Sequence, residues 1–144
     1  MVVIYAGFVM GYKYFSNQPK AIAIPQSKPK LNTIIIHNGK DSTIARVENI
    51  IQITSATPYI FIHLENKKYL HSETLKSIYG QMDDNVFIRV HKSTIINITK
   101  VNSFKSRLNG DYDLQLMNGD TVRLSRTYST NFKKHFKIVH QDTV

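Results

Sequence analysis

The 144-residue chain contains no cysteine and no tryptophan, and only 10 of its residues are acidic. The absence of cysteine excludes disulfide bonds, cysteine-ligated zinc and thiol nucleophiles. A chain of this length forms one domain and buries enough apolar surface to fold without covalent staples. Its six histidines are scattered, and it has no nucleophile motif and no glycine-rich phosphate loop. We therefore expect a binding domain without metal or cofactor, not an enzyme.

Positive charge dominates the chain, which has a formal net charge of +9 at pH 7. Residues 85–144 hold ten lysines and arginines against four aspartates, so this part carries 10 − 4 = +6. Residues 31–84 are nearly neutral, with five basic and six acidic residues. A basic half beside a neutral half is typical of a protein that binds a polyanion, although solvated basic faces are also common.

The N-terminal part differs from the rest of the chain. Residues 1–15 are apolar apart from Lys13, and residues 16–32 read as a proline-containing linker. The apolar run is shorter than the roughly 20 residues of a membrane-spanning helix, and no basic segment precedes it as in a signal peptide. Three interpretations stay open: the end of a transmembrane helix that begins upstream of Met1, a short hydrophobic anchor helix, or a loosely ordered tail. We favour membrane association, with the linker lysines on the cytoplasmic side.

From residue 33 onward, short alternating apolar segments and Asn-Gly pairs indicate antiparallel β-structure. The predicted strands are residues 33–37, 43–47, 50–54, 59–64, 68–70, 86–90, 101–105, 111–117 and 121–125. Two helices are expected, one capped by Ser72 and one carrying Tyr128, Phe132 and Phe136 at a spacing of four. The fold class that follows is mainly β (α+β), with residues 139–144 as a tail.

One segment carries most of the functional information. Residues 87–93 have the sequence Phe-Ile-Arg-Val-His-Lys-Ser. Residues 124–126, which follow a predicted hairpin, have the sequence Leu-Ser-Arg. These residues offer hydrogen-bond donors and positive charge, which suit phosphate oxygens and base edges. The pattern therefore favours binding of DNA.

The strand-rich body with Phe-x-Arg-Val-His and a downstream Ser-Arg resembles the LytTR family of bacterial DNA-binding domains over residues 33–138. The resemblance implies a fold of elongated small antiparallel β-sheets with two short flanking helices. It also implies sequence-specific binding of duplex DNA by a response-regulator-like transcriptional regulator. In this family, loops enter successive major grooves at repeated half-sites.

The same resemblance assigns roles to individual residues. His91 and Lys92 at the end of a strand and Arg126 after the hairpin match the family's base contacts, and the loop containing Thr57 matches a third contact region. The chain departs from the family pattern at Lys92, because lysine lacks the planar donor fork that reads a base through two bonds. It departs again at Pro58, which has neither a backbone N–H nor a polar side chain.

Five further residues complete the expected DNA-binding set. Arg89 either contacts phosphate or braces the loop that follows it. Asn97 suits a turn or a backbone carbonyl better than a base, since asparagine commonly bonds nearby backbone. Lys105 and Arg107 are expected at phosphates, with a solvated surface charge as the alternative. Ser93 is expected to contact DNA as part of the segment that contains His91 and Lys92.

The expected partner is duplex DNA, bound by a homodimer or a tandem pair. The domain is expected in the cytoplasm, tethered to the inner membrane if residues 1–15 insert, with its signal coming from an upstream sensor partner or a membrane event. The alternative is a membrane-associated basic β-domain that binds anionic lipid or a protein partner without base specificity.

Overall fold

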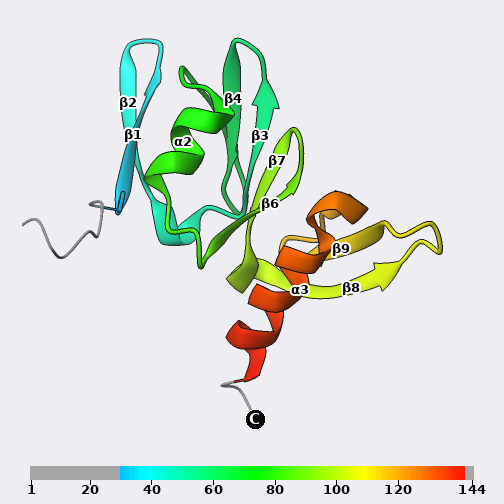
Figure 1. The fold of residues 1–144 in the computed structure, drawn as a ribbon. Coiled ribbons are helices and arrows are strands. Elements are labelled where there is room, and N and C mark those ends of the chain that lie inside the picture. Colours follow the sequence, from blue (N-terminus) through cyan, green and yellow to red (C-terminus); the bar gives the residue numbers. More distant parts are fainter. Residues whose placement is uncertain (1–29, 142–144) are drawn as a thin grey trace, which may run out of the picture.

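The structure, a computed structural model, describes residues 30–141, which form three antiparallel sheets and two α-helices (Figure 1). The strands are β1 (Thr33–Asn38), β2 (Asp41–Arg46), β3 (Gln52–Ala56), β4 (Tyr59–His63), β5 (Lys68–His71), β6 (Phe87–His91), β7 (Thr94–Asn97), β8 (Val101–Ser106), β9 (Tyr112–Leu116) and β10 (Thr121–Leu124). The helices are α2 (Leu75–Gln81) and α3 (Arg126–Gln141), and short 3-10 turns lie at Val47–Asn49 and Ile98–Lys100. The predicted hydrophobic helix and most of the predicted linker lie outside the described residues. Within residues 30–141, no helix is long and apolar enough to cross a membrane.

Neighbouring strands in the sheets are consecutive in the sequence, except for the pairing of β3 with β7. β1 and β2 form a two-stranded ribbon, the central sheet has the order β5-β4-β3-β7-β6, and the third sheet has the order β10-β9-β8. Gly39 and Gly119 lie in the turns of the first and last hairpins with φ of +67° and +92°. Glycine adopts this left-handed conformation without the crowding that a Cβ atom causes, which explains the Asn-Gly pairs.

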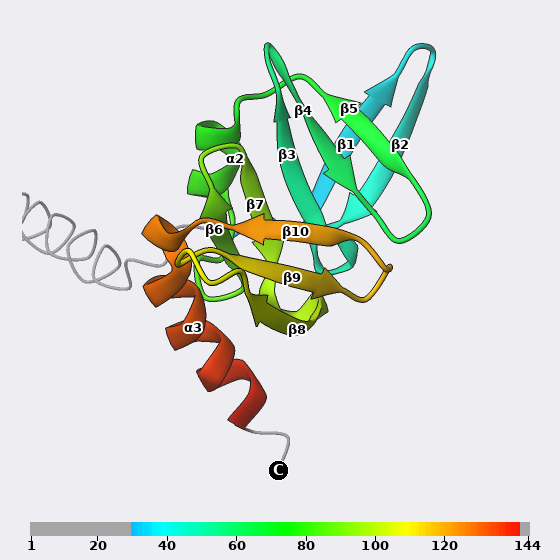
Figure 2. The ribbon, with the colours of Figure 1, turned by 90° about the vertical axis from the view of Figure 1, so that its right-hand side faces the viewer.

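Two apolar cores lie on the two faces of the central sheet. One core joins Ile53, Ile60 and Ile62 of this sheet to α2 and to the β1–β2 hairpin. The other joins Ile88 and Ile96 to the third sheet and α3. Strands β6 and β7 contribute to both cores, so they connect the two ends of the molecule (Figure 2). The structure thus confirms the mainly β fold with two flanking helices.

The structure corrects the sequence prediction at three places. Thr74, not Ser72, caps α2: its Oγ1 accepts a hydrogen bond from the backbone N–H of Ser77 at 3.1 Å. Strand β7 was not predicted, because all four of its residues are buried and the alternation that marks a half-exposed strand is absent. Helix α3 continues to Gln141, past the boundary expected at residue 138.

Candidate nucleic-acid interface

Two backbone hydrogen bonds bring the three predicted contact segments to one edge of the molecule. The N–H of Ser125, next to Arg126, donates to the carbonyl of Val90 at 2.9 Å. The N–H of Ser55 at the end of β3 donates to the carbonyl of Ser93 at 2.9 Å. The β3–β4 turn, the β6–β7 turn and the start of α3 are therefore fixed relative to one another.

Arg89 stabilises the backbone of the β6–β7 turn through two hydrogen bonds. Its Nε donates to the carbonyl of His91 at 3.3 Å, and its Nη2 donates to the carbonyl of Lys92. These bonds occupy one side of the guanidinium and fix the backbone that presents His91 and Lys92. Of the two roles expected for Arg89, the one seen in the structure is therefore stabilisation of the loop that follows it.

His91 is held in a defined orientation by Ser93. The backbone N–H of Ser93 donates to Nδ1 of His91 at 3.3 Å, and the Ser93 hydroxyl lies 2.9 Å from the same nitrogen. Because Nδ1 accepts a hydrogen bond from the backbone, the neutral ring carries its proton on Nε2. Nε2 is then a donor available to a ligand. Lys92 beside it is exposed.

Arg126 is positioned by Asp111 from the β8–β9 hairpin. Oδ1 of Asp111 accepts a hydrogen bond from the backbone N–H of Arg126 at 2.9 Å, at the first turn of α3. Oδ2 accepts hydrogen bonds from Nε of Arg123 at 3.0 Å and from its Nη2. The Arg123 guanidinium, followed by the Arg126 N–H, holds the pKa of the Asp111 carboxyl below its usual range.

The β8–β9 turn packs closely against the same arginine. A Cβ atom at Gly110, where φ is +93°, would lie 3.3 Å from Cβ of Arg126, so only glycine fits there without displacement. The Arg126 side chain is exposed, and within residues 30–141 no side chain accepts a hydrogen bond from its guanidinium. Sequence reasoning missed Asp111 and Gly110 as positioning residues, because the sequence marks Gly110 only as part of an Asn-Gly turn and Asp111 only as the start of a strand.

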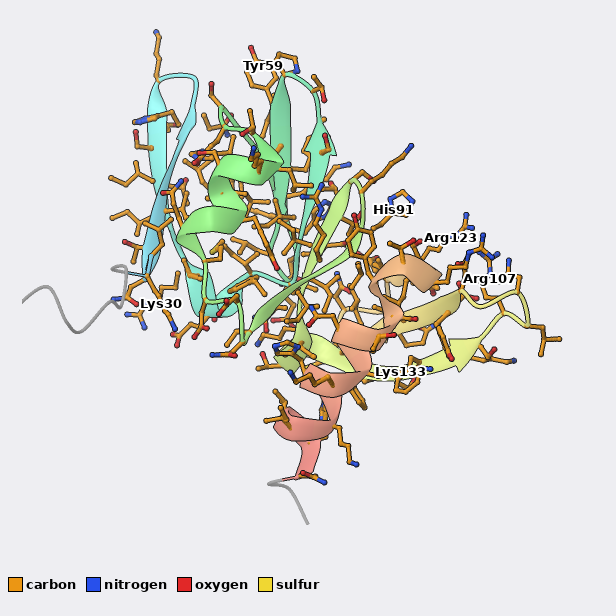
Figure 3. All side chains as sticks on the ribbon, viewed as in Figure 1. Lys30, Tyr59, His91, Arg107, Arg123 and Lys133 are labelled. Carbon is orange, nitrogen blue, oxygen red and sulfur yellow. The ribbon has the colours of Figure 1, made fainter. Side chains whose placement is uncertain are left out.

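Further basic side chains surround this edge. Lys105 is exposed, and Nε of Arg107 lies 3.6 Å from a carboxylate oxygen of Asp113. In Figure 3, His91, Arg123 and Arg107 lie on the right-hand side of the molecule, Tyr59 lies at its top, and Lys30 lies on the left. Arg107 and Arg123 are paired with aspartates, whereas Lys92, Lys105 and Arg126 add exposed positive charge, which suits a polyanion.

Asn97 does not belong to this surface, and its assignment as a DNA contact is corrected here. It is 1% exposed, and its Nδ2 donates to the carbonyl of Ile50 at 2.9 Å. Its Oδ1 accepts hydrogen bonds from the backbone N–H of Thr99 at 3.0 Å and from the Thr99 hydroxyl at 2.6 Å. Asn97 therefore has the backbone-bonding role that was the alternative from sequence.

Thr57 lies exposed in the β3–β4 turn, with its hydroxyl 3.3 Å from the hydroxyl of Ser55 and a cis peptide bond to Pro58. Across residues 30–141, no three histidine, aspartate or glutamate side chains gather as a metal site would require. The edge therefore provides hydrogen-bond donors and positive charge and not a set of metal ligands.

An antiparallel β-body that presents basic loops at one edge is typical of domains that bind nucleic acid. Residues 40–137 match the family model described as the LytTr DNA-binding domain, and the chain belongs to this LytTR family of DNA-binding domains. The resemblance seen in the sequence is thereby confirmed.

Relatives agree with this assignment. The chain is 28% identical over 96 residues to the sensory transduction protein LytT of Bacillus subtilis, covering 67% of this chain and 40% of that protein. It is 31% identical over 86 residues to the transcriptional regulatory protein LytR of Staphylococcus aureus, covering 60% of this chain and 35% of that protein. The chain thus spans less than half the length of these relatives.

A solved structure shares the fold. It is the LytTr DNA-binding domain of a putative methyl-accepting/DNA response regulator from Bacillus cereus, with a TM-score of 0.67 and 17% sequence identity. The match covers 73% of this chain and 96% of that domain. The mainly β architecture described above is therefore the LytTR fold.

Proposed function

We propose that residues 33–138 bind duplex DNA sequence-specifically, as the DNA-binding part of a bacterial transcriptional regulator. The observation that carries the proposal is the pair of backbone hydrogen bonds, Ser125 to Val90 and Ser55 to Ser93, which places three loops at one basic edge. Loops fixed in this way enter successive major grooves on one side of the duplex. Repeated half-sites then bind a homodimer or a tandem pair.

Each exposed residue at this edge has a chemical role in the proposal. Arg126 reads a guanine, because its planar guanidinium matches the O6 and N7 acceptors through two bonds. His91 donates from Nε2 to a base acceptor or a phosphate. Lys92 binds phosphate as a point charge, since lysine lacks a donor fork.

Other residues act on the DNA backbone. Lys105 and Arg107 on the β8–β9 hairpin neutralise phosphates, and Ser93 and Thr57 donate from hydroxyls in the two turns. Arg89 supports the complex indirectly by holding the β6–β7 turn. Backbone contacts supply affinity and orientation, whereas the contacts of Arg126 and His91 supply selectivity.

Two relatives, a sensory transduction protein and a transcriptional regulatory protein, support a role in transcription regulation. The domain would then work in the cytoplasm, where the DNA is. We include in the proposal a sensor partner or membrane tether that delivers the signal, with residues 1–15 as the tethering segment.

Enrichment of bound sequences from randomised duplex DNA, with the purified chain, tests this function. We expect a short motif repeated about one or two helical turns apart, at multiples of 10–10.5 base pairs. Binding that ignores base order, and that anionic vesicles compete away at equal charge, would instead support the lipid-binding alternative.

A further inference from the structure

The β8–β9 turn presents an apolar side chain where the edge is otherwise basic. Leu108 at the tip of this turn is 96% exposed, more than any other large apolar side chain among residues 30–141. In Figure 1 the turn between β8 and β9 extends beyond the rest of the ribbon. Leu108 belongs to neither apolar core, so its side chain is open to a binding partner.

The backbone at Leu108 adopts a conformation that disfavours leucine. Its φ is +70°, and Leu108 is the one non-glycine residue with positive φ among those that the structure describes. Glycine or asparagine would occupy this conformation with less crowding of the Cβ atom. The turn is nevertheless well defined: Oγ of Ser106 accepts from the N–H of Leu108 at 3.2 Å, and Oδ1 of Asn109 accepts from the N–H of Asp111 at 3.0 Å.

The β8–β9 turn lies next to Arg126. Gly110, two residues after Leu108, packs against the side chain of Arg126. Two residues span at most about 7 Å, which corresponds to about two base-pair steps along DNA. Lys105 and Arg107 precede Leu108, so the turn continues the positive surface of the candidate interface.

We propose that the β8–β9 turn is a further DNA-contacting loop, in which Leu108 packs against the 5-methyl group of a thymine in the groove that Arg126 enters. This inference rests on the proposed function. The thymine methyl is the apolar feature that the major groove presents, and an apolar side chain is its natural partner. The contacted thymine lies within about three base pairs of the guanine read by Arg126.

The test uses the duplex recovered by enrichment and the variant Leu108→Asn. Asparagine tolerates positive φ, so the variant keeps its folded structure and has an unchanged or higher melting temperature. Each thymine near the Arg126-dependent guanine is replaced in turn by deoxyuridine, which lacks only the methyl group. We expect one replacement to weaken binding by the native chain about three- to fivefold, the effect of one buried methyl group.

The same replacement is expected to leave the affinity of Leu108→Asn unchanged, because the apolar partner is already missing. Ile44→Thr is the matched control, since Ile44 is a 69% exposed apolar residue on β2, away from this edge, and this variant should respond like the native chain. The inference would be overturned if no thymine near that guanine shows an effect that depends on Leu108. It would also be overturned if Leu108→Asn bound the duplex as tightly as the native chain. Either result would leave the proposed function intact. Absence of any sequence-specific binding by the native chain would overturn both.

Discussion

The backbone N–H of Ser125 donates a hydrogen bond to the carbonyl of Val90, with an N···O distance of 2.9 Å. Val90 precedes His91 at the end of β6, and Ser125 precedes Arg126 at the start of α3. One bond between two backbone atoms therefore fixes the separation of the two residues proposed to read bases.

Replacement of Arg126 by alanine should remove base preference at one position without unfolding the domain. The guanidinium is exposed and makes no internal hydrogen bond within the described part of the chain. Loss of a two-bond contact to guanine costs about 1–3 kcal/mol, or about five- to 150-fold in affinity. Titration of labelled duplexes that carry each base at that position measures the effect. Lys134→Ala on the exposed face of α3 is the control and should keep the preference.

Replacement of His91 by glutamine should retain more affinity than replacement by alanine. Nδ1 of His91 is occupied by Ser93, so ligand binding uses the donor at Nε2, and a glutamine amide also places a donor at that distance. Equilibrium binding to the selected duplex compares the two variants. Equal losses would show that the ring nitrogen makes no hydrogen bond to DNA.

Replacement of Asp111 by asparagine should alter how stability depends on pH. The folded chain lowers the pKa of this carboxyl, so its stabilising effect is fully present above the unfolded value of about 3.9 and is lost as pH falls through the lower folded value. Denaturation at several pH values should show a constant deficit for Asp111→Asn above about pH 5 that shrinks below about pH 4. A deficit that persists unchanged to low pH would contradict this assignment.

Replacement of Asn97 by alanine should destabilise the fold and leave DNA recognition intact. The change removes the bond to the carbonyl of Ile50 and leaves the backbone N–H of Thr99 without its acceptor. Unsatisfied buried groups of this kind cost about 1–3 kcal/mol each. Denaturant unfolding measures the loss, and Asn66→Ala at an exposed position is the control. A change of base preference in the folded fraction would contradict the buried role.

Binding should weaken steeply with salt if phosphate contacts supply the affinity. For about six neutralised phosphates, log K falls against log salt concentration with a slope near −5. The variant Lys92→Ala should reduce the slope by about one unit, because lysine at the β6–β7 turn is proposed to contact phosphate. A slope near zero would refute the electrostatic part of the proposed function.

The sequence predicted most of the fold because its signals are local. Alternation of apolar residues and the Asn-Gly turns predicted the bounds of nine of the ten described strands within about two residues. Strand β7 was not predicted, because it is buried on both faces and its residues do not alternate. The contacts that build the site are not local: Asp111 lies between β8 and β9, and Arg126, 15 residues further on, begins α3. No periodic pattern encodes such a pair. The residue types of segments 87–93 and 124–126 favoured DNA, whereas the roles of His91 and Arg126 as base contacts followed only from the family resemblance.

Because the spacing of the three loops is fixed, the domain should be sensitive to the distance between the bases that it contacts. Loops joined through backbone atoms cannot adjust independently to the duplex, so the distance between contacted bases matters as much as their identity. One inserted base pair would move the second contact by about 3.4 Å and rotate it by about 35° around the helix axis. Single-base changes within a site should therefore be tolerated far better than a single-base insertion between contacts.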